Sequence, residues 1–267
     1  MRILLTNDDG IDAPGIHVLA AVLHGVAADL VVAAPSEDLS GTGAAIGPLH
    51  LRDGVELERC QLPDMPDLEA YRVDGPPGLA VLLARLGAMG DPPDMVVSGI
   101  NPGNNTGRSV LHSGTVGAAL TSLNFGGAGV AVSLQSPEDD DGEWQWETAA
   151  WVARTVVDAV MPIMPARFLL NVNVPALPLD EVKGWKRTRL AAFGTVRAVV
   201  DLDEPDASGR RRIEVTYRRT EEVMKPDTDT GAIIDGFVSV TWLHGIGAVT
   251  GDAPGETEVG LALDQLS

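Results

Sequence analysis

The first ten residues constrain the fold more than any other stretch of the chain. Residues 2–6 form a short, mainly apolar run without helical periodicity, which predicts a buried strand starting almost at the N-terminus. The run leads directly into Asn7-Asp8-Asp9-Gly10, and these residue types cannot continue a core strand. Open α/β sheets bind ligands at the carboxyl ends of their strands, so the paired aspartates predict a metal or ligand site. The same residue types dominate turns, and from these residues alone a plain turn is an equal alternative.

Further apolar runs alternate with helical patterns along the chain. Strands are expected over 30–34, 95–97, 130–134 and 168–174, and helices over 17–28, 79–86, 113–120 and 144–161. This alternation predicts an α/β class fold with a Rossmann-like, doubly wound, mostly parallel sheet. Asp53-Gly54 between two short β-type runs adds a predicted hairpin.

The sequence changes character after Pro178. Two charged β-type runs over 196–202 and 211–219 predict a projecting hairpin arm, and 238–242 predicts a final strand. We therefore expect a single domain over 1–267, with an α/β core over 1–178 and an extension over 179–267. A two-stranded ribbon is marginally stable alone and its edges invite pairing, so a homodimer or tetramer through this C-terminal arm is predicted.

Composition excludes several classes of partner. The net charge is −19, from 19 Lys and Arg against 38 Asp and Glu, and such a field repels polyanions, so no nucleic-acid partner is expected. No apolar run approaches the roughly 18 residues of a membrane span, and no membrane partner is expected. Cys60 is the single cysteine, which together with the lack of a signal-peptide pattern predicts a cytoplasmic location. A small phosphorylated ligand stays compatible with the charge if a metal ion supplies local positive charge.

Oxygen ligands follow three of the predicted strands. Asp8 and Asp9 follow the first, Ser40 follows the second, and Asn101 follows the strand over 95–97. In a doubly wound sheet these loops meet at one edge. Carboxylate, hydroxyl and amide oxygens favour Mg²⁺ or Mn²⁺ over zinc. Taken singly, Ser40 is more often only a turn residue, and it is the arrangement at successive strand ends that favours a metal site.

A helix start beside the third loop predicts a phosphate site. Ser113-Gly114-Thr115 offers free backbone N–H groups at the positive end of a helix dipole, although Ser113 alone is more often only a helix cap. The glycines of 36–48 do not fit a dinucleotide fingerprint, and no Walker-type G-K-[ST] occurs. A metal facing a phosphate cradle predicts phosphoryl chemistry. The expected phosphate and substrate contacts are Asn7, Gly41, Asn105, Ser113, Gly114 and Thr115.

Several motifs together resemble the SurE family. They are T-N-D-D-G-x-x-A-P-G from Thr6, A-P-x-x-x-x-S-G from Ala33, V-S-G-I-N-x-G-x-N from Val97, S-G-T-V-G-A-A from Ser113, N-V-N-V-P from Asn171 and the closing V-S-V-T. The resemblance implies a Rossmann-like fold whose C-terminal arm is exchanged between subunits. It implies a divalent-metal phosphatase, or 5'-nucleotidase, that hydrolyses nucleoside 5'-monophosphates, with activity in some members on 3'-monophosphates and short polyphosphate.

The same resemblance assigns residues. It implies one divalent metal ion per subunit, Mg²⁺, Mn²⁺ or another divalent ion. Its metal ligands fall on Asp8, Asp9, Ser40 and Asn101, with Asp8 and Asp9 also catalytic. This chain departs from the family pattern at Pro76-Pro77, at His112 and at Trp242, so substrate preference is less closely implied than reaction type.

Two other functions fit part of the pattern. A haloacid-dehalogenase-like aspartyl phosphatase needs D-x-D and a later lysine, whereas here Asp8 and Asp9 are adjacent and the three lysines lie beyond the core. A sensor that binds Mg²⁺-nucleotide without turnover is the alternative from another class. Within the phosphatase hypothesis the general acid is either Asp9 or His112.

Overall fold

The computed structural model describes residues 1–26, 29–51, 53–137, 139, 142–193, 196–202, 204, 208–219 and 224–247. Its first half contains β1 (Arg2–Thr6), α1 (Pro14–His24), β2 (Asp29–Pro35), η1 (Leu49–Leu51), β3 (Leu57–Leu62), β4 (Met65–Val73), α2 (Pro77–Arg85), β5 (Met95–Pro102), η2 (Gly107–Leu111), α3 (Gly114–Asn124) and β6 (Ala128–Leu134). The second half contains α4 (Trp146–Val160), η3 (Met161–Ile163), β7 (Leu169–Val174), η4 (Leu179–Glu181), β8 (Trp185–Arg187), β9 (Val196–Leu202), β10 (Ile213–Arg219), α5 (Asp229–Ile234) and β11 (Val238–Leu243). Among the described residues no helix is long and apolar enough to span a membrane.

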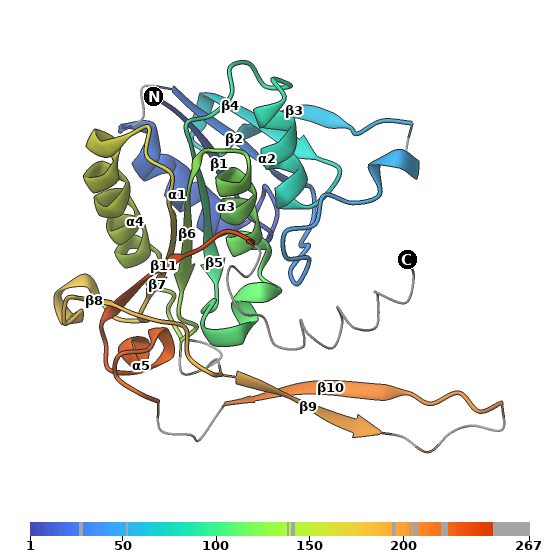
Figure 1. The fold of residues 1–267 in the computed structure, drawn as a ribbon, viewed down its shortest axis with the longest axis vertical. Coiled ribbons are helices and arrows are strands. Elements are labelled where there is room, and N and C mark those ends of the chain that lie inside the picture. The colour runs from blue at the N-terminus through green and yellow to red at the C-terminus, as the bar shows by residue number, and fades with distance from the viewer. Residues whose placement is uncertain are drawn as a thin grey trace, which may run out of the picture.

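A nine-stranded sheet forms the centre of the molecule, in the order β3-β4-β2-β1-β5-β6-β7-β11-β8. The strands from β4 to β7 are parallel to one another, whereas β3 and β11 run antiparallel to their neighbours β4 and β7. Helices α1 and α4 pack together on one face of the sheet, and α2 and α3 on the other (Figure 1). The predicted α/β class with a mostly parallel, doubly wound sheet is confirmed.

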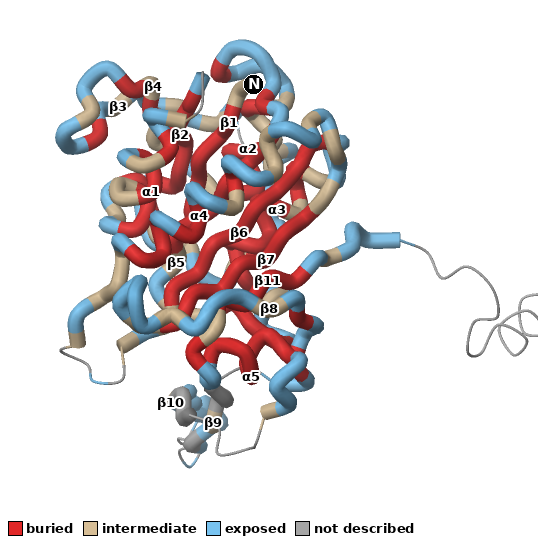
Figure 2. Tube along the Cα trace, turned by 90° about the vertical axis from the view of Figure 1, so that its left-hand side faces the viewer, coloured by how far each residue is buried: buried red, intermediate tan, exposed pale blue. Residues whose placement is uncertain are grey.

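The central strands are buried on both faces. In β1, Ile3 and Leu5 point into the core beneath α1 and α4, and Leu4 points into the core beneath α2, each with 0% of its surface exposed. Figure 2 shows the central strands as a continuous buried band. The continuous apolar runs of the sequence follow from this burial, because a parallel strand covered by helices on both sides has no solvent face.

The order of strands reverses direction at β1. From β1 the chain adds β2 and β4 on one side, and then returns to add β5 on the other side. At such a reversal the loops that leave neighbouring strands turn to opposite faces, which opens a crevice at their carboxyl ends. Asp8 and Asp9 leave β1 at this crevice, and Asn101 lies near the end of β5.

The predicted hairpin around Asp53-Gly54 is wrong. Leu49–Leu51 is a short 3-10 helix, and the hairpin is instead formed by β3 and β4, with Asp64 at φ 59° between them. The Asp53-Gly54 dipeptide is typical of tight hairpins, but pairing partners decide where a turn forms. Here β4 pairs with β2 inside the sheet, and β3 completes the edge.

The C-terminal part of the chain adds to the sheet and projects from it. Strand β11 pairs with β7 and β8, so the predicted final strand extends the sheet. Strands β9 and β10 pair antiparallel in a separate two-stranded sheet that extends away from the body (Figure 1). The division of the chain into a core over 1–178 and an extension over 179–267 stays a prediction.

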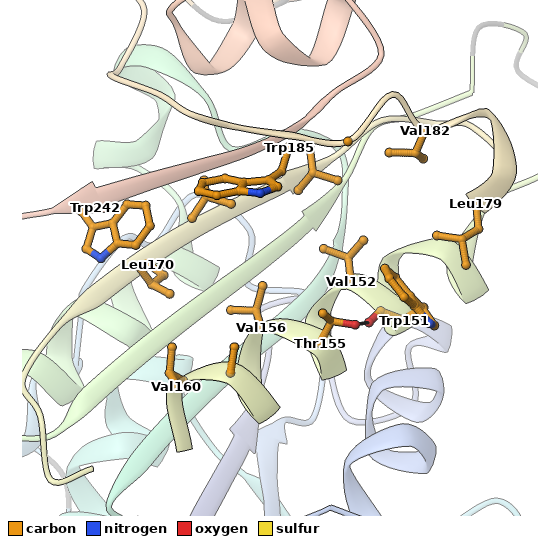
Figure 3. A pocket seen from close by; sticks show the side chains of 14 residues that line it. Trp151, Val152, Thr155, Val156, Val160, Leu170, Leu179, Val182, Trp185 and Trp242 are labelled. Carbon is orange, nitrogen blue, oxygen red and sulfur yellow. Dashed lines mark hydrogen bonds between the residues drawn. The ribbon is translucent and has the colours of Figure 1, made fainter. Parts of the chain in front are cut away.

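An apolar groove lies between α4 and the β7–β11–β8 end of the sheet (Figure 3). Its volume is about 650 Å³, and three tryptophans that line it, Trp151, Trp185 and Trp242, are each about half exposed. Trp242 is the residue at which this chain departs from the closing family motif. The departure therefore falls in this groove, whose lining residues do not include the paired aspartates.

Candidate functional site

Three loops meet in one polar cavity of about 330 Å³. The loop after β1 is bound to the loop after β2, because the amide of Leu39 donates to the carbonyl of Asp8 at 2.8 Å. The loop after β2 is bound in turn to the start of α3, where the amide of Gly43 donates to the carbonyl of His112 at 3.1 Å. The cavity is lined by Asp8, Asp9, Asp38, Ser40, Gly41, Asn101, Pro102, Asn105, Ser109, His112 and Ser113.

Asp8 is held in one orientation by the start of α3. The hydroxyl of Thr115 donates to its Oδ1 at 2.5 Å, and the amide of Gly114 donates to its Oδ2 at 3.1 Å. Burial raises the pKa of Asp8 above its ordinary value, and the hydrogen bonds from Thr115 and Gly114 oppose that rise. A Cβ atom at Gly114 would lie 2.7 Å from Asp8, so the carboxylate packs directly on this helix start.

Asp9 lacks the partners that Asp8 has. Its Oδ2 is buried and accepts no hydrogen bond. Burial, followed by the negative charges of Asp8 and Asp38, raises the pKa of Asp9 to about 7. A carboxylate in these surroundings is stabilised by any cation that enters the cavity.

Asn101 also presents an acceptor without a matching donor. Its Oδ1 lies 3.1 Å from the hydroxyl of Thr115, but that hydroxyl has one hydrogen and donates it to Asp8. The side-chain amide of Asn101 is oriented by donating to the carbonyl of Gly103 at 2.7 Å.

Ser40 completes the predicted metal set at the rim of the cavity. Its hydroxyl donates to Oδ1 of the exposed Asp38 at 2.6 Å, which leaves its lone pairs available. Within the described residues no three His, Cys, Asp or Glu side chains cluster as a metal site, so the candidate set depends on the neutral oxygens. Two carboxylates, a hydroxyl and an amide carbonyl with more acceptors than donors fit a hard divalent cation.

Only three of the six predicted phosphate contacts line the cavity. Gly41, Asn105 and Ser113 line the cavity, whereas Gly114 and Thr115 use their donors on Asp8. Ser113 also caps α3, since its hydroxyl accepts from the amide of Val116 at 3.1 Å. Asn7 is fully buried and is not among the residues that line the cavity; its Nδ2 donates to the carbonyl of Gly10 at 2.9 Å and its Oδ1 has no partner among the described residues.

A buried amide network holds Asn105 in place, and its role is not evident from the sequence pattern. The amide of Asn105 donates to Oδ1 of Asn173 at 2.8 Å, and its carbonyl accepts from Nδ2 of Asn171 at 2.8 Å. Its own Nδ2 donates to the hydroxyl of Ser133 at 2.9 Å. The available signal was the pair of asparagines in the otherwise apolar β7, since buried side-chain amides require partners. Asp38, Ser109 and Pro102 are further lining residues that the sequence analysis did not assign.

The chain is similar to known proteins in sequence and in fold. The family model described as "Survival protein SurE" matches residues 3–195. The chain belongs to the SurE family. The 5'-nucleotidase SurE of Hyphomonas neptunium is 36% identical over 248 residues, covering 91% of this chain and 93% of that protein. The 5'-nucleotidase SurE of Alkalilimnicola ehrlichii is 40% identical over 245 residues, covering 90% and 88%. A crystal structure of the SurE protein from Aquifex aeolicus superposes with a TM-score of 0.75 at 29% identity, covering 100% of this chain and 99% of that chain.

The departures from the SurE pattern fall in different places. His112 lines the cavity, so this departure lies where a substrate would be contacted. Pro76 and Pro77 begin α2 and are not among the described residues that line the cavity. Of these departures from the SurE pattern, His112 is the one that lines the polar cavity among the described residues.

Proposed function

We propose that this SurE family member is a divalent-metal-dependent 5'-nucleotidase, which hydrolyses nucleoside 5'-monophosphates to nucleoside and phosphate. The observation that carries the proposal is the surplus of acceptor oxygens at the carboxyl ends of β1 and β5, around an oriented Asp8. The 36–40% identity to curated 5'-nucleotidases over about nine-tenths of the chain supports it. Activity on 3'-monophosphates and short polyphosphate belongs to the same proposal.

The chain supplies little positive charge of its own to a phosphate. Among the described residues that line the cavity there is no lysine or arginine, and three aspartates repel an anion. The residues that would hold a divalent metal ion are Asp8, Asp9, Ser40 and Asn101. When bound there, Mg²⁺ or Mn²⁺ would supply the positive charge that a phosphate needs in this cavity and would make an attacking water more nucleophilic.

The residues around the metal set have separate tasks in this proposal. Thr115 and Gly114 keep Asp8 in a single orientation, and Asn105 and Ser113 line the cavity in which a phosphate would lie. Two groups in the cavity can exchange a proton with the leaving nucleoside oxygen: Oδ2 of Asp9, which lacks a partner, and the imidazole of His112.

Phosphate release from AMP tests the proposed activity. We expect release with added Mn²⁺ or Mg²⁺ and none in excess EDTA. Asp9→Asn is expected to lose this activity, whereas the control Asp12→Asn is expected to retain it, because Asp12 is mostly exposed and pairs with Arg72 outside the cavity. Tight binding of AMP without phosphate release would instead favour a nucleotide sensor, and full activity in EDTA would contradict the metal requirement.

We also propose that the arm formed by β9 and β10 joins two subunits. Val200 and Leu202 of β9 pair across the ribbon with Val215 and Ile213 of β10. Their exposed fractions are 51%, 57%, 51% and 57%, so the arm carries four exposed aliphatic side chains in two cross-strand pairs. Because charged residues dominate the sequence of the arm, this apolar patch was not predicted from the sequence. Exposed aliphatic groups that gather on a projecting ribbon favour contact with another chain, and a second copy of this protein, as a homodimer or tetramer, is the proposed partner.

A further inference from the structure

Asp229 is a fully buried carboxylate that lies outside the candidate site but is bonded to it. It is the first residue of α5 and has 0% of its surface exposed. Its Oδ2 accepts from the amide of Gly107 at 2.8 Å, across 122 positions of sequence. Its Oδ1 accepts from the amides of Ala191 and Thr230, each at 2.8 Å. Every partner found for it in the described part of the chain is a neutral donor.

The bond to Gly107 restrains the loop that forms one wall of the polar cavity. This loop runs through η2 to the start of α3 and contributes Ser109, His112 and Ser113 to the cavity. One end of it is held at Asn105 by the asparagines of β7. The Asp229 bond adds a second restraint two residues later, where Gly107 has a φ of 58°. Two restraints so close together define the direction in which η2 begins.

Stability of α5 alone does not account for Asp229. The hydroxyl of Thr228 already caps this helix by accepting from the amide of Gly231 at 3.1 Å. Burying a carboxylate away from any cation is costly, and a shorter neutral residue would avoid that cost. Position 229 nevertheless holds a side chain with two acceptor atoms, and one of them accepts from Gly107 in the loop that forms the wall of the cavity.

We infer that Asp229 is a positioning residue for the phosphatase reaction, because it sets the placement of η2, and with it Ser109 and His112, through the amide of Gly107. Asp229 lies outside the set of residues that line the cavity, so it acts only through the loop. The part of this inference that concerns the phosphatase reaction rests on the proposed function. Its structural half, the restraint of the loop, can be tested without any activity.

Asp229→Asn removes the hydrogen bond to Gly107 and can leave the bonds to Ala191 and Thr230 in place. The asparagine Oδ1 can keep the bonds to Ala191 and Thr230, but its NH₂ group then faces the N–H of Gly107, and that bond is lost. The matched control is Asp235→Asn. Asp235 follows the same helix and carries the same charge, but its carboxylate is half exposed and pairs with Lys186.

Three measurements on the full-length protein test the inference. First, hydrogen exchange of a peptide covering 105–112 should show protection at Gly107 in the wild type and faster exchange in Asp229→Asn. Second, kcat/KM for AMP should fall about tenfold in Asp229→Asn, because groups that are misplaced around a substrate lower the rate even when the change lies away from the chemistry. Third, the Mn²⁺ concentration for half-maximal activity should stay unchanged, because the proposed metal ligands lie outside η2. The Asp235→Asn control should match the wild type in all three.

The outcomes separate the possibilities. An unprotected Gly107 amide in the folded wild type overturns the inference even if Asp229→Asn does not fold. Wild-type kcat/KM in Asp229→Asn, with only a lower melting temperature, assigns Asp229 a structural role and also overturns it. If the wild type releases no phosphate from AMP, the proposed function fails, and the exchange measurement still decides whether Asp229 restrains the loop.

Discussion

Asp9→Asn should make the metal-free protein more stable at alkaline pH. In the folded chain the pKa of Asp9 is raised to about 7 from 3.8 by burial and by the charges of Asp8 and Asp38. The unfolded chain therefore releases this proton at lower pH than the folded chain, and stability falls as the pH rises from about 4 to about 7. Above pH 7 the folded protein carries the full penalty of an ionised Asp9.

The two pKa values set the size of the effect. At about 1.4 kcal/mol for each pH unit between them, the penalty reaches about 4 kcal/mol. Asparagine removes the charge but leaves a buried amide without a partner for its second atom, which costs about 2 kcal/mol. The net gain expected above pH 8 is about 2 kcal/mol, or roughly 4 °C in melting temperature for a chain of this length.

Thermal unfolding in excess EDTA at pH 5 and pH 8.5 measures this gain. We expect Asp9→Asn to melt above the wild type at pH 8.5 and to lose that advantage at pH 5. At pH 5 Asp9 is still protonated in the folded chain, and the penalty of roughly 1.6 kcal/mol no longer exceeds the cost of the unpartnered amide. Addition of Mn²⁺ should stabilise the wild type more than the variant. The control Asp12→Asn removes a carboxylate whose pKa is lowered by its hydrogen bonds from Arg72, so it should bring no gain at either pH. A variant equally destabilised at both pH values would refute the reasoning.

Three further predictions concern the site and the arm. Gly114→Ala should reduce phosphate release from AMP at least tenfold with a smaller effect on stability, because the added Cβ would lie 2.7 Å from Asp8. Steady-state kinetics and a melting curve measure the two effects, and a wild-type kcat would contradict the prediction. No phosphoryl group should be trapped on Asp8 during turnover, since water is the proposed nucleophile; mass spectrometry of acid-quenched enzyme that found an aspartyl phosphate would favour the dehalogenase-like alternative. Deletion of Asp201 to Arg212 should lower the oligomeric mass measured by light scattering, and an unchanged mass would show that the arm does not hold the subunits together.

The candidate site could be located from sequence because its residues follow local signals. Asp8 and Asp9 interrupt an apolar run, and any polar residue just after a buried parallel strand must lie at the carboxyl edge of the sheet. Ser113 was predictable for a similar reason, since a hydroxyl residue before a helical pattern satisfies the free amides of the first turn. The hairpin at Asp53-Gly54 failed because a turn signal does not say which strands find partners.

The sequence by itself determined the alternation of strands and helices, the strand ends at which Asp8, Asp9 and Asn101 lie, and the hairpin pattern of β9 and β10. These features depend on residues within a few positions of one another, so periodicity and turn chemistry are enough to read them. The tertiary structure alone decided that Asn171 and Asn173 hold Asn105, and that Asp229 reaches Gly107 across 122 positions. A buried polar group must find a partner, but its own sequence neighbourhood does not say where that partner lies, because the packing of the whole sheet brings the two together.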